Sequence, residues 1–426
     1  MITLAKMPTA ITSDYHPIHN WFNFIAGYSP EYVETTINNY RDRNGVYPDL
    51  IYDPFVGCGT TCVVSNNMNI RSIGIERNPF FFKIGYTKAH AIKTLVYADQ
   101  ICEEFLKLSS QVENTNYISK LSKSASEYLG KLFSSTSLNI LLKLRNLVRS
   151  YRDYKYYMGY TFLSKMMEFV TTSKTDGIYK APSSKKKSLS IDEAIKKTWS
   201  IISSGKISKT NDLAKIYFDS CIKYNFPSNV CDLVIFSPPY LNNFDFAEMT
   251  RMQLYFWEEA TSWQDITENI RCDMLINTTT ALKYVRNVGI QEHMRRSLPK
   301  ELLIDLEPLV NQLKSITIED PRKKQYYLII YPYLYQMQII LQKCYNCLKP
   351  HGEIHIVVSD AAFYGLHIDT QKFLCLILSA IGFSEVKFLQ MRARGDRWIL
   401  EKRKASGKQL GEYEIIASKQ DYYNPS

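Results

Sequence analysis

The alternation of hydrophobic and polar positions divides the chain into two kinds of segment. In the first hundred residues, and again from about residue 212, short apolar runs alternate with stretches of helical periodicity. This order of strand, loop, helix and strand is typical of a parallel sheet covered by helices. The pattern therefore predicts an α/β core with strands at 50–52, 72–76, 215–219, 232–236 and 354–358, and with helices from 29 onward and at 61–67, 79–92, 328–348 and 369–381.

The segments between these elements follow a different pattern. Apolar residues recur at helical spacing in 97–211 and strand signals are few, so we expect a helical insertion that contains a polar, basic loop at 177–190. Residues 241–324 are mixed and mostly helical, and we expect a second insertion there. The predicted domains are a discontinuous core at 1–96 and 212–402, these two insertions, and a loose polar tail at 403–426, with two closing strands inside 383–400.

Composition narrows the class of protein only modestly. Of the 426 residues, 45% are hydrophobic and 22% are charged, which suits a globular protein with a buried core and excludes disordered and fibrous classes. The formal net charge of +10 permits a nucleic-acid partner without requiring one. Nine scattered cysteines argue against a disulfide framework and favour a cytoplasmic location. No apolar run is long enough to cross a bilayer, so we expect no membrane partner.

The first candidate for chemistry is the string DPFVGCGTT, which begins at Asp53 directly after the first predicted strand. A glycine-rich turn in this place lets a ligand approach the backbone, and the helix that follows offers free N–H groups at its start. The string lacks both the Gly-Lys-Ser/Thr of a Walker loop and the spacing of a dinucleotide fingerprint. Its length makes it far more specific than Gly57 and Gly59 alone.

An acidic residue, Glu76, stands at the end of the second predicted strand. A carboxylate in this position can accept hydrogen bonds from both hydroxyls of a ribose. A single glutamate at a strand end is more often simply solvated. The glycine-rich turn upstream reverses that preference and favours ribose binding.

The tetrapeptide Ser237-Pro238-Pro239-Tyr240 follows the buried run DLVIF. Its two prolines stiffen the turn and remove two backbone donors. Facing outward are the Ser237 hydroxyl, the carbonyl oxygens and the ring of Tyr240. Hydrogen-bond acceptors beside an aromatic face suit a planar ring that carries an exocyclic amino group.

Together these motifs resemble the S-adenosylmethionine-dependent DNA amino-methyltransferases, over the first hundred residues and 212–400. The resemblance implies a Rossmann-like class I methyltransferase fold, with a mostly parallel seven-stranded sheet and helical insertions. It implies S-adenosylmethionine as the cofactor, and no metal, because the methyl group on the sulfonium is already activated. The implied cofactor-binding residues are His19, Trp21, Asp53, Phe55, Gly57, Gly59, Thr60, Thr61, Glu76, Asp219 and Ser220, and the implied catalytic residues are Ser237, Pro238, Pro239 and Tyr240.

The resemblance also narrows the substrate. It implies methyl transfer to an amino group of a base flipped out of double-stranded DNA, in an enzyme paired with a restriction endonuclease. The serine of SPPY favours N4 of cytosine, because adenine enzymes more often carry Asp or Asn there. Adenine N6 is the alternative, followed by RNA methylation and by a catalytically silent DNA-binding module. No Pro-Cys dipeptide is present, which excludes the cytosine C5 chemistry. The target sequence and the choice between monomer and dimer stay open.

Two groups of basic residues are candidates for contact with DNA phosphates. Lys180 and 185–187 lie in the polar loop, where a merely solvated charge run is the alternative. Arg392, Arg394 and Arg397 lie near the closing strands. The helical insertion at 97–211 is the candidate for target recognition, with 241–324 as the alternative.

Overall fold

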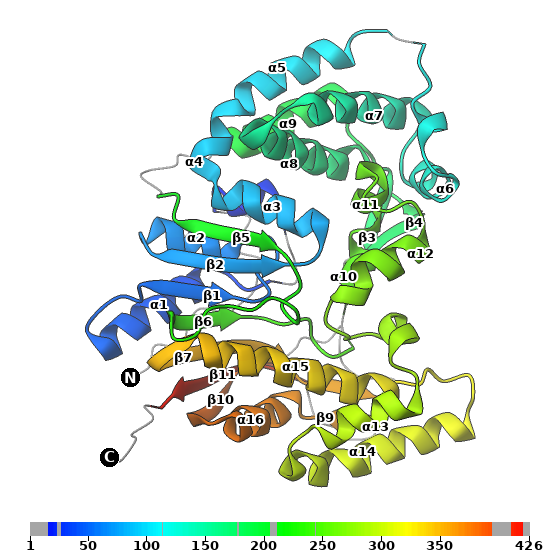
Figure 1. Ribbon diagram of the computed structural model, residues 1–426. Coiled ribbons are helices and arrows are strands. Elements are labelled where there is room, and N and C mark those ends of the chain that lie inside the picture. Colours follow the sequence, from blue (N-terminus) through cyan, green and yellow to red (C-terminus); the bar gives the residue numbers. More distant parts are fainter. Residues whose placement is uncertain are drawn as a thin grey trace.

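A seven-stranded sheet forms the centre of the computed structural model, which describes residues 16–23, 27–112, 114–176, 179–204, 211–242, 244–393 and 410–420 (Figure 1). The strand order is β10-β11-β7-β6-β1-β2-β5. The strands are β1 (Leu50–Asp53), β2 (Arg71–Glu76), β5 (Ala214–Phe218), β6 (Cys231–Phe236), β7 (Leu348–Ser359), β10 (Phe383–Ala393) and β11 (Gly411–Lys419).

All neighbouring strands pair in parallel except those on either side of β11. β1 pairs in parallel with β2 and β6, β2 with β5, and β6 with β7, whereas β11 runs antiparallel to both β7 and β10. The predicted Rossmann-like sheet, seven-stranded and mostly parallel, is therefore confirmed. One consequence concerns the site: the start of β11 lies at the edge of the sheet where the parallel strands end.

Both faces of the sheet are covered, and alternate residues of each strand serve the two faces. Ile51, Leu233 and Ile235 pack with side chains of α1 (Pro30–Asn44) and α2 (Thr60–Asn67). Their sequence neighbours pack on the other face, against α14 (Lys300–Glu319), α15 (Tyr327–Cys347) and α16 (Thr370–Ile381); among them are Tyr52, Val234 and Phe236. Continuous apolar runs in the sequence reflect this burial on both sides.

Two of the helices begin where their capping residues predict. The Ser29 hydroxyl accepts from the Tyr32 N–H, Pro30 occupies the first turn of α1, and Gly45 ends the helix in a left-handed conformation. Asn78 caps α3 (Pro79–Ala89) by accepting from the N–H groups of Phe80 and Phe81. A short α4 (Ala91–Thr94) follows.

The segment 97–211 is mainly helical, as predicted. It contains α5 (Ala98–Ser109), α6 (Lys123–Leu132), α7 (Ser135–Ser150), α8 (Asp153–Val170) and α9 (Ile191–Ser203). The predicted second insertion contributes α10 (Phe246–Met249), α11 (Arg251–Trp257), α12 (Trp263–Asp265) and α13 (Val288–Arg296), followed by α14. Within the described ranges, we find no helix long and apolar enough to cross a membrane.

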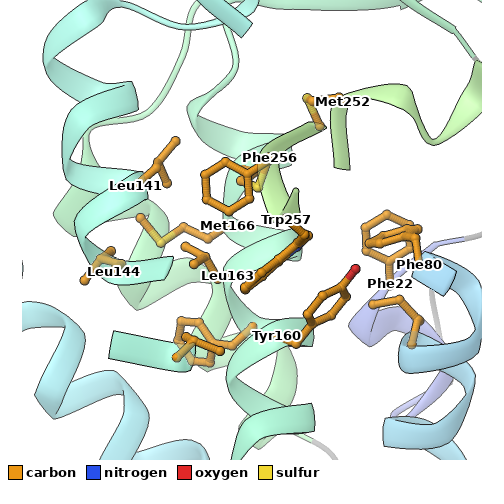
Figure 2. Close-up of a cluster of buried hydrophobic side chains, with 14 of the residues drawn as sticks. Phe22, Phe80, Leu141, Leu144, Tyr160, Leu163, Met166, Met252, Phe256 and Trp257 are labelled. Atoms are coloured by element: carbon orange, nitrogen blue, oxygen red, sulfur yellow. The ribbon is translucent and has the colours of Figure 1, made fainter. Parts of the chain in front are cut away.

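The two predicted insertions share a hydrophobic core, which the sequence pattern did not indicate. Trp257 of α11 stacks on Tyr160 of α8 with ring centroids 4.1 Å apart, and its indole N–H donates to the Ser164 hydroxyl at 3.0 Å. Figure 2 shows the same cluster extending to Phe22 and Phe80, which precede the insertions. The separate domains stay a prediction, but this packing joins α11 to the first insertion.

Two local predictions are wrong. The polar loop at 177–190 contains β4 (Tyr179–Lys185), which pairs with β3 (Ser173–Asp176) as a hairpin. The predicted tail at 403–426 contains β11, a central strand of the sheet. Of the two strands predicted inside 383–400, the first is β10, which pairs with β11, and the segment 394–400 lies outside the described residues.

The charges of β11 explain why it was missed. Glu412 and Glu414 stand among its apolar residues and make the segment look exposed, but Glu412 is buried, Glu414 is partly buried, and both carboxylates are hydrogen-bonded. A further short hairpin, β8 (Ala361–Phe363) with β9 (Leu366–Ile368), follows β7.

The shared core generates a stability prediction. Trp257 is 4% exposed, so truncation in Trp257→Ala should lower the free energy of unfolding by about 3–5 kcal/mol through lost burial and a cavity. Urea unfolding followed by circular dichroism measures the loss. The control is Ile304→Ala on α14, where the side chain is 73% exposed. Equal, small losses for both variants would contradict the shared core.

Candidate active site

A cavity with about 620 Å³ of empty space, part of it open to solvent, lies at the carboxyl ends of four neighbouring parallel strands. The chain order reverses between β1 and β6, so the cavity occupies the topological switch point, where open α/β sheets bind their ligands. Its walls bring together the three predicted motifs. The lining residues are Pro54, Phe55, Gly57, Ile75, Glu76, Arg77, Phe81, Asp219, Cys221, Ser237, Pro238, Pro239, Phe246, Asp273, Met274 and Leu275.

The loop after β1 depends on glycines with positive φ. Gly57 has φ 52° and Gly59 has φ 88°, and the second forms the N-cap of α2. A Cβ on Gly59 would lie 3.1 Å from both the Cα and the carbonyl oxygen of Gly85 in α3. The backbone of the loop therefore lies directly on α3, with no room for a side chain between them.

Asp53 holds this loop from behind the cavity wall. Its Oδ2 accepts from the Thr61 hydroxyl at 2.5 Å and from the Tyr28 hydroxyl at 2.8 Å, and its Oδ1 accepts from the Phe55 N–H at 2.9 Å. Burial raises the pKa of Asp53 to about 6. Asp53 and Thr61 thus shape the loop and do not line the cavity.

Glu76 connects the end of β2 to the same loop. One carboxylate oxygen accepts from the Gly57 N–H at 3.0 Å and the other from the Asn78 N–H at 2.7 Å. Burial raises the pKa of Glu76 to about 7. The Glu76 side chain also lines the cavity. It therefore presents a hydrogen-bond acceptor among apolar residues of the cavity wall.

The SPPY tetrapeptide leaves β6 and forms the opposite wall. Ser237, Pro238 and Pro239 line the cavity, whereas Tyr240 does not. The Ser237 hydroxyl donates to the Tyr240 hydroxyl at 3.3 Å, and the Tyr240 hydroxyl donates to Glu412 Oε1 at 2.7 Å. Tyr240 therefore adjoins the cavity wall through Ser237 without lining the cavity.

Several of the predicted cofactor residues lie away from the cavity wall. His19 and Trp21 belong to a buried 3₁₀ turn, η2 (His19–Trp21), that is fastened by the Lys88 ammonium, which donates to the carbonyls of His19 at 3.0 Å and Phe22 at 2.7 Å. Burial lowers the pKa of His19 well below its ordinary value. Also absent from the wall are Gly59, Thr60 and Ser220.

The cavity wall includes residues that sequence reasoning missed. Asp273, Met274 and Leu275 come from the second predicted insertion and close one side. Asp273 forms an ion pair with Arg77 at 3.1 Å, and its carbonyl accepts from Ser220 at 2.7 Å. Arg77 directly follows Glu76 in the sequence, so its position next to a predicted site residue could have indicated it. Asp273 lies 196 positions beyond Arg77, and no motif near it in the sequence indicated that it belongs to the site.

Three of the four lysines predicted for DNA contact bind the protein itself. Lys180 forms an ion pair with Glu168, and Lys186 donates to the Glu168 carbonyl at 2.7 Å. Lys185 donates to the Lys131 carbonyl at 2.8 Å. These bonds hold the β3–β4 hairpin against the helices.

The arginines predicted near the closing strands also have a partner where they are described. Arg392 forms an ion pair with Glu412 at 2.6 Å, and Arg394 and Arg397 lie outside the described residues. Among the described residues, no cluster of His, Cys, Asp and Glu could hold a metal ion.

Comparison with known proteins finds relatives that cover most of the chain. A family model described as DNA methylase matches residues 13–87. The Type II methyltransferase M.AvaI of Nostoc sp. is 25% identical over 417 residues, covering 88% of this chain and 80% of the relative. The Type II methyltransferase M.BsoBI of Geobacillus stearothermophilus is 22% identical, covering 94% and 84%.

A solved rRNA methyltransferase, aviRa of Streptomyces viridochromogenes, aligns over 93% of this chain and 89% of its own with a TM-score of 0.29 and 8% identity. The fold assignment above rests on the strand order of the sheet.

The chain is thus similar to DNA methylases of the amino-methyltransferase family. Its cofactor is S-adenosylmethionine, as the motifs predicted. DNA is accordingly the substrate class. The comparisons do not separate transfer to N4 of cytosine from transfer to N6 of adenine.

The close approach at Gly59 generates the second prediction. Gly59→Ala should lower the free energy of unfolding by about 1–3 kcal/mol, because φ 88° strains an alanine and its Cβ meets the backbone of Gly85. The matched control is Gly130→Ala on α6, where a Cβ meets open space and a helical alanine gains stability. Urea unfolding of both variants measures the difference. A loss no larger than that of the control would contradict the tight packing of loop and α3.

Proposed function

We propose that this protein transfers a methyl group from S-adenosylmethionine to the exocyclic N4 of cytosine in double-stranded DNA. One observation carries the proposal: the acceptor groups of Ser237–Pro239 form one wall of the cavity whose other walls hold Phe55, Gly57 and Glu76. A donor amino group and an activated methyl group can therefore meet in a single enclosure.

The cavity residues fit the cofactor. Glu76 offers two carboxylate oxygens to the hydroxyls of a ribose, and Asp219 stands at the next strand end, where it flanks an adenine. Ile75, Phe81 and Leu275 supply apolar surface for a planar ring. When bound, S-adenosylmethionine supplies a methyl group that its positive sulfur already activates. Asp53 and Thr61 lie behind the wall and hold the glycine-rich loop in the shape that fits the cofactor. His19 and Trp21 hold the N-terminal segment in the same way.

Ser237 and the Pro238 carbonyl orient the amino nitrogen. Each accepts one of its two hydrogens, which favours a pyramidal nitrogen whose lone pair points at the methyl group. This contribution is orientation together with hydrogen bonding that strengthens in the transition state. A base in duplex DNA reaches this wall only after flipping, at a cost of a few kcal/mol, and the ring of Tyr240 stacks on it there.

The serine of SPPY supports cytosine N4, with adenine N6 as the alternative. The relatives are named Type II methyltransferases, which supports a role as the protective partner of a restriction endonuclease. Target recognition belongs to the helical segment 97–211. The packing of α11 into that segment gives 241–324 a supporting part in it.

The deciding experiment is transfer of label from methyl-labelled S-adenosylmethionine to unmethylated plasmid DNA, followed by nucleoside analysis. N4-methylcytosine supports the proposal. N6-methyladenine selects the alternative, and a lack of label on DNA overturns the function.

A substitution tests the role of the acceptor wall. Ser237→Ala removes one acceptor for the amino group, so kcat should fall by roughly 10²–10³, the range found for single groups that stabilise a transition state. The Kd for S-adenosylmethionine, measured by calorimetry, should change little. Equal losses of kcat and of cofactor affinity would contradict this role.

The raised pKa of Glu76 generates a prediction of pH dependence. Only the ionised carboxylate accepts from both ribose hydroxyls, and the pKa of about 7 means that protonation begins near neutrality. Cofactor affinity should therefore be greatest above pH 7, and the Kd should rise by up to about tenfold per pH unit below it. Calorimetry from pH 5.5 to 8.5 measures the curve. Glu76→Gln, which does not titrate, should bind weakly at every pH, and an unchanged slope in this variant would assign the titration elsewhere.

A further inference from the structure

A row of hydrogen bonds leads from the cavity wall into the sheet. Ser237 donates to the Tyr240 hydroxyl at 3.3 Å, Tyr240 donates to Glu412 Oε1 at 2.7 Å, and Arg392 Nε donates to Glu412 Oε2 at 2.6 Å. The Glu412 side chain is only 7% exposed. The row therefore ends in a buried carboxylate that both a tyrosine and an arginine hold.

Sheet topology brings these distant residues together. Glu412 lies near the start of β11, opposite Arg392 on β10 and Ser359 on β7. Because β11 is antiparallel, its start lies at the edge where β6 ends and Ser237 begins the SPPY turn. A residue 172 positions after Tyr240 thereby becomes its partner.

The carboxylate fixes the direction of every bond in the row. An ion-paired carboxylate only accepts, so the single hydroxyl proton of Tyr240 is directed to Glu412. The Tyr240 oxygen can then meet Ser237 only as an acceptor. The hydroxyl proton of Ser237 is consequently directed to Tyr240, and its remaining lone pairs are left for the cavity.

We propose that Glu412, held by Arg392, is a positioning residue that makes Ser237 an obligate hydrogen-bond acceptor and so selects an exocyclic amino group over a carbonyl oxygen. An amino group brings N–H donors to these lone pairs, whereas the carbonyl of thymine or guanine would place acceptor against acceptor. A buried acceptor without a donor raises the free energy of the bound state. The direction of the hydrogen bonds in the row therefore favours binding of a base with an amino group at this position. The inference rests on the proposed function, because it assigns the base to the wall formed by Ser237.

Reversal of the row tests the inference. Glu412→Gln keeps the size of the side chain, but its amide N–H can donate to Tyr240 and free Ser237 to act as a donor. Its kcat for DNA methylation should fall roughly ten- to hundredfold, the effect of one hydrogen bond to a charged group. The Kd for S-adenosylmethionine should stay at the wild-type value. Tyr240→Phe breaks the same row while keeping the aromatic ring, does not alter β11, and should reduce kcat similarly.

The two substitutions should not be additive. In the Tyr240→Phe background the carboxylate no longer reaches Ser237, so adding Glu412→Gln should change kcat less than about twofold. The control is Glu414→Gln. Glu414 is a partly buried carboxylate two residues along the same strand that accepts from Tyr32 at 2.8 Å and pairs with His355 at 2.9 Å.

Three results decide the matter. A kcat loss in Glu412→Gln, with normal cofactor affinity and urea unfolding equal to that of Glu414→Gln, supports the inference when the double variant is no worse than Tyr240→Phe. Additive losses, or the same kcat for Glu412→Gln and Glu414→Gln, overturn it. A wild-type protein that labels no DNA overturns the proposed function itself, and these two failures are therefore distinguishable.

Discussion

The buried carboxylate of Asp53 is the interaction on which the site depends. It joins the end of β1 to the first turn of α2 through Thr61 and to the residues ahead of α1 through Tyr28. A carboxyl group in this apolar position is tolerated because hydroxyl and amide donors surround it. Its bonds fix the course of the glycine-rich loop, and the loop in turn receives Glu76 at the Gly57 N–H. Loss of one carboxylate would therefore loosen two walls of the cavity.

The local features of the core were predictable from the sequence, because local chemistry determines them. Strands such as β6 show as apolar runs, α1 shows its start at Ser29 and Pro30, and the motif residues stand directly after strand ends. The parallel order of the strands then brings Gly57, Glu76 and Ser237 to one cavity. For these residues, a position directly after a strand in the sequence is enough to predict a position at the cavity.

Other features could not be predicted because they depend on contacts between distant segments. Asp273 meets Arg77 across 196 positions and Glu412 meets Tyr240 across 172 positions, so no spacing or periodicity indicates these contacts. β11 was read as a tail because its buried glutamates look like surface residues until their partners are known. The sequence also could not show that Asp53 and Thr61 lie behind the wall. A sequence motif identifies which residues belong to a site but not which of their side chains face the ligand.

The position of β11 has a consequence for how the protein folds. This strand follows every other strand of the sheet in the sequence, yet it lies between β7 and β10 and pairs with both. Until it arrives, the parallel strands on one side and β10 on the other have no backbone partner at the gap. Its pairings with β7 and β10 join neighbouring parts of the chain, whereas its Glu412 meets Tyr240 across 172 positions. Insertion of β11 between β7 and β10 also places Glu412 beside Tyr240, so a chain that has not completed the sheet lacks a completed site.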